Sequence, residues 1–356
     1  FPQYLKYFME SELYWSQIRD GTIATAQPNC NGQTLTHMIL PLPPYKEQIR
    51  IVSKLNNLAV YLGKYEVADS LLKGLQSSFP EALKKSILQW AVQGKLVPQD
   101  PNDEPASVLL ERIRVEKEQL IKAGKIKRDK HESIIFRRDN SHYEKLDGIE
   151  RCIDDEIPFE IPDSWCWCRL GVISTYSHSK KKINAQNADD GMWELDLEDI
   201  EKGGQLIRIK SVKECDAKGD KTFFCKGDIL YNKLRPYLLK ILIAPNDGIC
   251  TPEIVPFALY GDINSDYIVS YLKSPYVDNL INSITYGVKM PRVGTETMVS
   301  LLVPIPPISE QHRIISKINN INLEVKYEKK NNRFISYSLS IFIFRKYNKK
   351  GKCYRK

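Results

Sequence analysis

The sequence predicts a mixed α+β protein of more than one domain, and three observations support this. One 18-residue stretch occurs twice, a long stretch without proline carries apolar residues at helical spacing, and a region of about 150 residues is rich in short β-prone runs. With 356 residues, 42% of them hydrophobic and 27% charged, the chain is long enough for two or three domains. This composition excludes collagen-like and wholly disordered chains.

An internal repeat organises the chain. The residues PLPPYKEQIRIVSKLNNL at 41–58 recur as PIPPISEQHRIISKINNI at 304–321, with eleven of 18 positions identical and a constant offset of 263. The same offset pairs upstream residues, among them Tyr4 with Tyr267, Phe8 with Tyr271, Ser11 with Ser274 and Ile18 with Ile281. We therefore expect a duplicated unit, a globular piece followed by a helical spacer, of which the chain holds the end of copy one and most of copy two.

The first spacer predicts a long helix. Between Pro44 and Pro80 apolar residues recur at steps of mostly three and four, as in a coiled-coil seam: Ile51, Leu55, Leu58, Leu62, Tyr65, Ala68, Leu72, Leu75 and Phe79. An amphipathic helix lying on a core has the same period and stays an alternative. A new helix is expected at Ser78, because Ser78 and Glu81 have capping-box spacing, and it should run to Gly94. A charged helix at 106–123 and a polar, basic linker ending near 155 should follow.

Residues 156–303 predict a mixed α/β domain. Short β-rich runs, such as GQLIRIKSV at 204–212 and YLLKILIAP at 237–245, alternate with Gly, Asp, Asn and Pro. A helical run is expected near 266–272.

Residues for catalysis or metal binding are not evident. The sequence has no phosphate-binding G-x-x-x-x-G-K-[ST] or G-x-G-x-x-G pattern, and its eight cysteines form no C-x-x-C pair. We expect reduced thiols, no metal, no cofactor and no membrane span, since the longest apolar run is far shorter than about 20 residues. The net charge of +8 comes from the end of the chain: residues 326–356 carry +10 and the rest −2. A DNA-binding argument must therefore rest on local patches.

Three local clusters in the α/β domain carry basic, aromatic and amide side chains suited to nucleic acid. Lys and Arg contact phosphates, and Arg, Asn and Lys also read base edges. The first cluster is Lys180, Lys181 and Lys182; the second is Tyr231, Asn232, Lys233, Arg235, Tyr237 and Lys240; the third is Lys289 and Arg292. An acidic run from Asp189 to Glu201 would repel phosphate and should face elsewhere. Taken alone, each basic cluster is also what a solvated surface would show.

Several motifs in fixed order resemble the DNA-specificity (S) subunits of type I restriction–modification systems. They are the P-x-P-P…E-Q-x-R-I pattern of the repeat, GKLVPQ at 94–99, IPDSWCWCRLG at 161–171 and GDILYNKLRPY at 227–237. The resemblance covers nearly the whole chain up to about Glu328. It implies target-recognition domains alternating with helical spacers that pair as an antiparallel coiled coil, each domain reading half of a bipartite DNA site.

This resemblance implies a non-catalytic, cytoplasmic, DNA-binding subunit. Its partners would be double-stranded DNA, methyltransferase (modification) subunits and a restriction endonuclease/motor subunit. It divides the chain into five parts. Residues 1–40 would be the remnant of a first recognition domain, 41–155 the first spacer with its linker, and 156–303 a second recognition domain. Residues 304–328 would begin a second spacer, and 329–356 form an off-pattern basic tail.

Two departures from the pattern leave other functions open. Residues 1–40 resemble only the last part of a recognition domain, and after Glu328 the second spacer does not continue as the first does. A truncated donor cassette for recombination of specificity genes would show both departures. A coiled-coil assembly protein without a DNA role is a further alternative, which salt-dependent DNA binding would exclude.

Overall fold

The computed structural model describes residues 1–21, 32–128, 133–178, 181–285 and 290–330. By its internal contacts the chain divides into two compact units, residues 1–79 and the remainder from Pro80. Helix α4 (Tyr45–Val92) belongs partly to each. Within the described residues no helix is long and apolar enough to cross a membrane.

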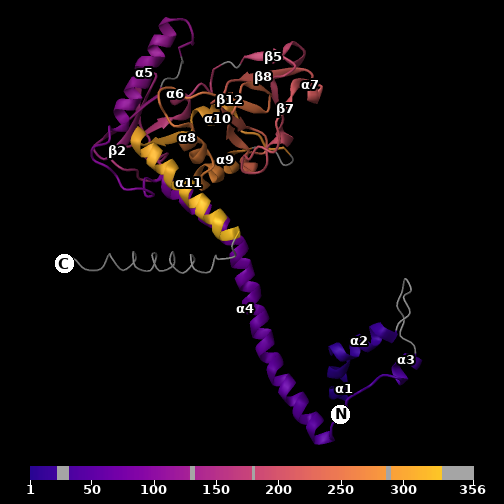
Figure 1. Cartoon of the computed structure of the whole chain (residues 1–356). Coiled ribbons are helices and arrows are strands. Elements are labelled where there is room, and N and C mark those ends of the chain that lie inside the picture. The colour runs from indigo at the N-terminus through magenta and orange to yellow at the C-terminus, as the bar shows by residue number, and fades with distance from the viewer. Residues whose placement is uncertain (22–31, 129–132, 179–180, 286–289, 331–356) are drawn as a thin grey trace, which may run out of the picture. The chain divides into compact units, whose positions relative to one another are not determined.

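Unit 1 consists of helices in its described part (Figure 1). They are α1 (Pro2–Met9), α2 (Glu12–Gly21), α3 (Gly32–Thr36) and the first part of α4.

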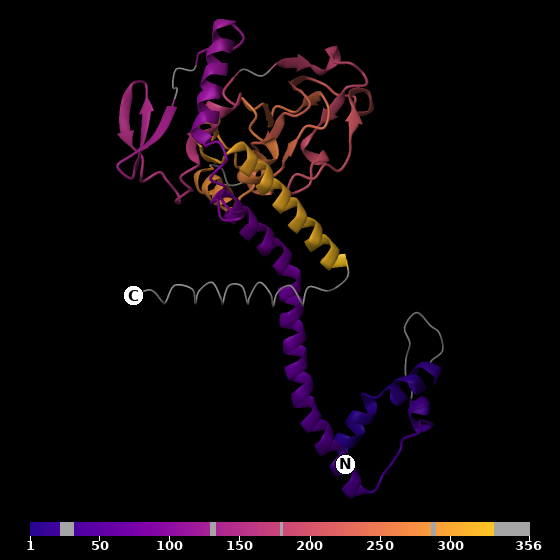
Figure 2. The same ribbon diagram turned by 60° about the vertical axis from the view of Figure 1, so that its left-hand side comes forward.

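Unit 2 is a mixed α/β structure in which helices and several small sheets surround one large core (Figures 1 and 2). Its helices are the end of α4, α5 (Ala106–Lys122), α6 (Leu170–Ile173), α7 (Val212–Cys215), α8 (Ser265–Leu272), α9 (Pro275–Ile284), α10 (Thr295–Val299) and α11 (Ile308–Lys330), with 3-10 turns η1 (Ala185–Asn187), η2 (Leu197–Asp199) and η3 (Pro236–Leu238). Its strands are β1 (Ser133–Arg138), β2 (Ser141–Leu146), β3 (Ile149–Cys152), β4 (Cys166–Arg169), β5 (Lys182–Asn184), β6 (Trp193–Leu195), β7 (Lys210–Ser211), β8 (Asp220–Phe224), β9 (Ile229–Asn232), β10 (Ile241–Ile243), β11 (Gly248–Cys250), β12 (Ile254–Phe257) and β13 (Leu302–Ile305).

The strands form four sheets. Their orders are β1-β2-β3, β10-β9-β12, β5-β8-β11-β6-β7 and β13-β4, and the pairing is antiparallel except between β11 and β6. Strands β9 and β12 are buried along their whole length, which fixes the loops that leave them. The expected helix near 266–272 is confirmed as α8, and the expected charged helix as α5. Of the run at 204–212, only the last part forms a strand, β7.

The internal repeat is confirmed element by element. Helices α1, α2 and α3 correspond to α8, α9 and α10, because adding 263 to the first and last residue of each gives the first and last residue of its counterpart. The side-chain hydrogen bonds repeat as well. Tyr4 donates to the carbonyl of Pro41 as Tyr267 does to that of Pro304, at 2.8 and 2.7 Å. The Gln48 amide donates to the Pro43 carbonyl, as Gln311 does to that of Pro306.

The helix start expected at Ser78 is wrong. No new helix begins at Ser78, because α4 runs without interruption through Pro80. The hydroxyl of Ser78 donates back to the carbonyl of Gly74 at 3.0 Å, so it serves the preceding turn instead of capping a new one. The helix does end as expected: Gly94 has φ +67°, and the N–H of Lys95 returns to the carbonyl of Trp90.

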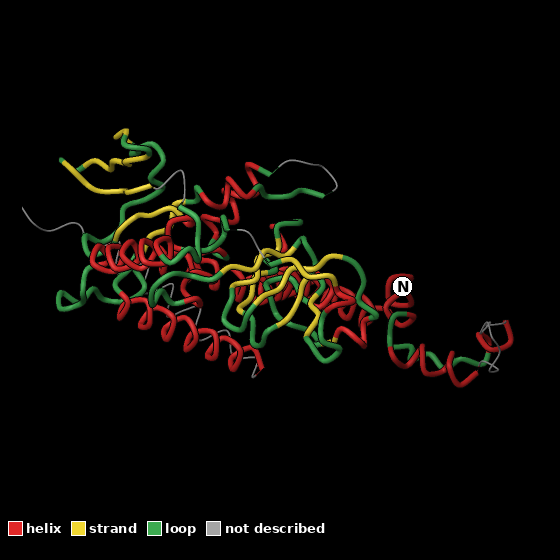
Figure 3. The backbone as a smooth tube through the Cα atoms, turned by 90° about the horizontal axis from the view of Figure 1, so that it is seen from above, coloured by secondary structure: helices red, strands yellow, loops and turns green. Residues whose placement is uncertain are grey.

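The expected linker before residue 155 is instead a three-stranded meander, β1-β2-β3, which forms a sheet of its own at one side of unit 2 and contacts strand β4 (Figures 2 and 3). Its two turns are Asp139-Asn140 and Asp147-Gly148, and all four residues have positive φ, as two-residue hairpin turns require. The Asp-Gly pair between alternating residues is a hairpin signal that sequence reasoning passed over.

Candidate nucleic-acid interface

The loop between β9 and β10, residues 233–240, carries most of the second basic cluster. Asn232, at the end of the buried strand β9, holds the base of the loop. The side-chain N–H of Asn232 donates to the carbonyl of Leu234 at 2.7 Å, and its side-chain oxygen accepts the backbone N–H of Leu234 at 3.0 Å. The start of the loop is therefore fixed by the strand that precedes it.

Arg235 is exposed and has φ +51°, an uncommon conformation for a residue with a side chain. Its N–H donates to the carbonyl of Pro291 at 2.8 Å, and its own carbonyl accepts the N–H of Leu238. Leu239 also has positive φ, +50°. Such backbone strain persists where surrounding contacts impose it, and it is common at binding sites. The Arg235 side chain is thus presented to solvent by a rigid loop.

Lys233 and Arg292 lie on adjacent segments. The N–H of Lys233 donates to the carbonyl of Glu253, and the N–H of Val293 donates to the carbonyl of Lys233. Arg292 donates to both carboxylate oxygens of Glu253, at 3.1 and 2.9 Å. This pair lowers the pKa of Glu253, with a smaller contribution from Lys233. The fold therefore brings parts of the second and third clusters together, although some 60 residues separate them in sequence.

Three members of the second cluster are unavailable to a ligand in this structure. Tyr231 is buried, and burial raises the pKa of its hydroxyl. Asn232 is buried and engaged with Leu234. The ammonium group of Lys240 is half-buried and donates to the carbonyl of Leu197 at 2.7 Å. We therefore assign these three a role in shaping the loop, whereas Tyr237 is exposed beside Arg235.

The first cluster lies on a different sheet. Lys181 and Lys182 are exposed at the edge strand β5, and the Lys181 ammonium lies 5.2 Å from the ring centre of Phe223. Within the described part of the chain, no hydrogen bond or ion pair joins these two lysines to the loop at 233–240. Lys180 and Lys289 lie outside the described residues.

The acidic run is largely neutralised within the domain. Glu194 is buried against Lys221 at 2.6 Å. Asp199 is also buried, and it pairs with Arg208 at 2.6 Å and with Lys210 at 2.9 Å. Much of the negative charge therefore stabilises the fold and does not oppose a phosphate backbone.

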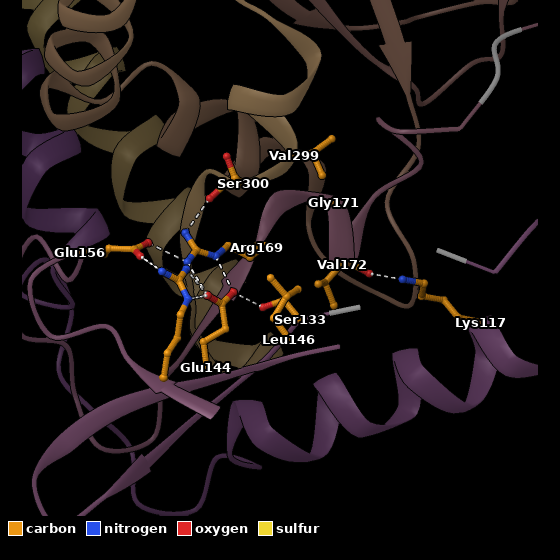
Figure 4. A pocket seen from close by; sticks show the side chains of 11 residues that line it. Lys117, Ser133, Glu144, Leu146, Glu156, Arg169, Gly171, Val172, Val299 and Ser300 are labelled. Carbon is orange, nitrogen blue, oxygen red and sulfur yellow. Dashed lines mark hydrogen bonds and ion pairs between the residues drawn. The ribbon is translucent and has the colours of Figure 1, made fainter. Parts of the chain in front are cut away.

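A cavity of about 260 Å³ lies where the meander, α5 and α6 meet (Figure 4). Its charged residues bind one another. Glu144 accepts from both Arg169 and Arg151, Arg169 also pairs with Glu156 at 2.7 Å, and Lys117 donates to the carbonyl of Val172. Sequence reasoning missed this network, and the contact of Arg292 with Glu253, because the partners lie 7 to 55 residues apart and no spacing rule relates them. Because its charges are already paired, the cavity anchors the meander and is a poor ligand site.

No group of three or more His, Cys, Asp or Glu residues suited to a metal ion occurs in the part of the chain that the structure describes. Among the described basic residues of the three clusters, Lys181, Lys182, Arg235 and Arg292 are exposed and Lys233 is partly exposed. Arg292 is paired with Glu253.

Comparisons with known proteins agree on one family. Residues 173–337 match the family model described as type I restriction modification DNA specificity domain. The specificity subunit of the type I restriction enzyme EcoAI of Escherichia coli is 34% identical over 68% of the chain. That of EcoEI, also of Escherichia coli, is 32% identical over 67% of the chain. The chain spans about two fifths of the length of these relatives, 39% and 38%. A crystal structure of the HsdS subunit from Thermoanaerobacter tengcongensis aligns with 93% of the chain and 65% of its own length, at 16% identity and a TM-score of 0.42.

Proposed function

We propose, on the premise that the chain belongs to the family of type I restriction–modification DNA-specificity subunits, that it is a non-catalytic subunit whose α/β domain recognises duplex DNA. The same premise supports methyltransferase subunits and an endonuclease/motor subunit as partners, and a cytoplasmic location. These partners and the location are predictions for this chain.

The observation that best supports DNA recognition is the rigid loop at 233–240. Its exposed Arg235 is held in a strained backbone conformation by a hydrogen bond to Pro291, and Lys233, the first residue of the loop, is bonded through its backbone to Glu253 and Val293. Because the backbone at Arg235 is already fixed, binding would cost mainly the freedom of its side chain, and the guanidinium can bond a phosphate or a guanine edge with two N–H groups. We therefore assign the interface to Lys233, Arg235, Tyr237 and Arg292. Lys181 and Lys182, at the start of β5, stay candidates for outer phosphate contacts.

A salt-titration experiment tests this assignment. Binding of the full chain to mixed-sequence duplex DNA should weaken in the Lys233→Ala/Arg235→Ala variant, and its log–log salt slope should flatten by about 0.9 for each lost phosphate contact. The matched control is Lys127→Ala/Lys145→Ala, which removes two exposed positive charges elsewhere in unit 2. Equal slopes for the two double variants would show that the effect is one of net charge, and would move the interface away from this loop.

A further inference from the structure

Lys273, which directly follows helix α8, carries a positive charge without a partner. Its side chain is partly buried, and in the part of the chain that the structure describes its ammonium group forms no hydrogen bond or ion pair. Burial lowers the pKa of Lys273 to about 8, and the charge of Asp266, in the first turn of α8, opposes this only in part. A cation that loses water without gaining a partner costs stability, so this group is a candidate for binding an anion from outside the chain.

The repeat shows that the end of the helix does not itself require a lysine. The repeat partner of Lys273 is Glu10, which follows α1 with nearly the same backbone angles, φ −89° and ψ −6° against φ −91° and ψ 0°. Glu10 is exposed and pairs with Lys6 at 3.9 Å. A cation near a helix C-terminus is favourable by a small amount, but the same helix end here carries the opposite charge. The lysine at 273 therefore has a reason outside the repeated fold.

A glycine turn makes room for the ammonium group. Gly203 and Gly204 have positive φ, +90° and +88°. A Cβ at Gly204 would lie 2.8 Å from the Nζ atom of Lys273 and would collide with the carbonyl of Ile241 in β10. The ammonium group therefore lies in a narrow crevice between this turn, β10 and the end of α8, which packs on β10. The crevice is open to solvent at Nζ, which is unpaired but not fully buried.

This crevice adjoins the loop at 233–240. The N–H of Gly203 donates to the carbonyl of Leu238 at 2.9 Å, and β10 begins directly after the loop. Helix α9, which begins two residues after Lys273, packs on the turn η3 within the loop. The loop that presents Arg235 thus shares its base with the crevice. A DNA backbone offers a row of phosphates, so neighbouring phosphates can meet Arg235 and Lys273.

We propose that Lys273 is a phosphate-binding residue of the DNA interface, which takes a backbone phosphate into the crevice beside Gly204. The inference rests on the proposed DNA recognition and extends it to a residue outside the three basic clusters. The bound phosphate supplies the counter-charge that the folded chain lacks, so the proton stays on Lys273 in the complex. Free inorganic phosphate has the same chemistry, and the experiments distinguish the two sources.

Salt titration of the full chain against mixed-sequence duplex DNA tests the contact. Lys273→Met keeps the aliphatic stem and removes the charge, so it should bind about tenfold more weakly, with a log–log salt slope flatter by about 0.9. The matched control is Lys127→Met, which removes an exposed positive charge elsewhere in unit 2. Equal affinities and slopes for the two variants would overturn the inference and leave the proposed function standing. No DNA binding by the unmodified chain would refute both.

Urea unfolding separates a binding role from a structural one. Because the pKa of Lys273 is lower in the folded state, its charge destabilises the fold fully below pH 8, and this effect is lost as the pH rises from 8 to 10.5. Lys273→Met should therefore unfold at a higher urea concentration at pH 7, by a margin that shrinks over the same range. A lower midpoint for Lys273→Met at pH 7 would show that the lysine stabilises the fold, and would overturn the inference.

Lysine acetylation with an N-hydroxysuccinimide ester, followed by mass spectrometry, identifies the source of the phosphate. Lys273 should react in the free chain, and duplex DNA should protect it while Lys127 stays reactive. Millimolar inorganic phosphate should protect Lys273 far less than DNA does. Protection by inorganic phosphate without protection by DNA would assign the crevice to a free anion and overturn the inference, as would a reactivity of Lys273 that neither changes.

Discussion

The carboxylate of Glu144 allows a quantitative test of how the meander is fixed to unit 2. It is buried and accepts hydrogen bonds from Arg169 at 2.9 Å, from Arg151 at 2.5 Å and from the hydroxyl of Ser133 at 2.5 Å (Figure 4). Burial alone would raise the pKa of Glu144, but these donors outweigh burial and lower it from 4.5 to about 2. Glu144→Gln keeps the shape of the side chain and removes the charge that both arginines share.

The size and direction of the effect follow from this pKa. A difference of about 2.5 units between the unfolded and folded states corresponds to about 3 kcal/mol, at about 1.36 kcal/mol per unit. Because the Arg151 side chain is about half exposed, we expect a somewhat smaller value, about 2–3 kcal/mol. The folded-state pKa is the lower one, so this stability is fully present above pH 4.5. It is lost as the pH falls from 4.5 toward 2.

Urea unfolding of the full chain between pH 3 and pH 7, followed by circular dichroism, measures this difference. At pH 7 the Glu144→Gln variant should be less stable by about 2–3 kcal/mol, and this difference should shrink to roughly half as the pH falls from 4.5 to 3. The control is Glu150→Gln, which removes a partly exposed carboxylate of the same meander that pairs with Arg138 at 3.2 Å. It should change stability by less than about 1 kcal/mol. A Glu144→Gln variant as stable as the unmodified chain at pH 7 would refute the reasoning.

Two further predictions concern packing. The seam residues of α4 are exposed at Leu62, Tyr65, Leu72 and Leu75, so the chain should self-associate at micromolar concentration. The double variant Leu72→Glu/Leu75→Glu should relieve this self-association. A monomeric unmodified chain in analytical ultracentrifugation would contradict the prediction. A Cβ at Gly171 would lie 2.4 Å from a methyl group of Val299, so Gly171→Ala should destabilise unit 2 by about 1–3 kcal/mol. An unchanged midpoint of urea unfolding would show that α10 shifts to make room for the added methyl group.

Sequence patterns predicted those parts of the fold that depend on local periodicity or on repetition. The helical runs expected at 106–123 and near 266–272 are α5 and α8, and the repeat offset relates α8, α9 and α10 to α1, α2 and α3. The prediction at Ser78 was wrong because a capping-box spacing competes with the propagation of an existing helix, and here propagation prevails through Pro80. The meander was missed because its positive-φ turns lie in a polar stretch that composition alone classes as a linker.

The candidate interface could be predicted only in part, because a basic cluster in sequence does not specify which side chains reach solvent. Lys233, Arg235 and Lys240 lie within eight residues, yet the strand pairing of β9 with β10 turns Lys240 onto the carbonyl of Leu197 and leaves Arg235 exposed. The contact between Arg292 and Glu253 depends on two loops meeting in space, which no spacing rule encodes.

The repeat shows the same limit most sharply, because two similar sequences have different surroundings. Eleven of 18 positions agree, the internal hydrogen bonds agree, and yet Leu42 is exposed where Ile305 is buried. The difference comes from strand β4, which lies some 135 residues before its partner β13 in the chain and has no counterpart beside residues 39–42 in the described part of unit 1. A duplicated sequence therefore predicts the shape of each copy, whereas the burial of a face depends on the segment that pairs with it.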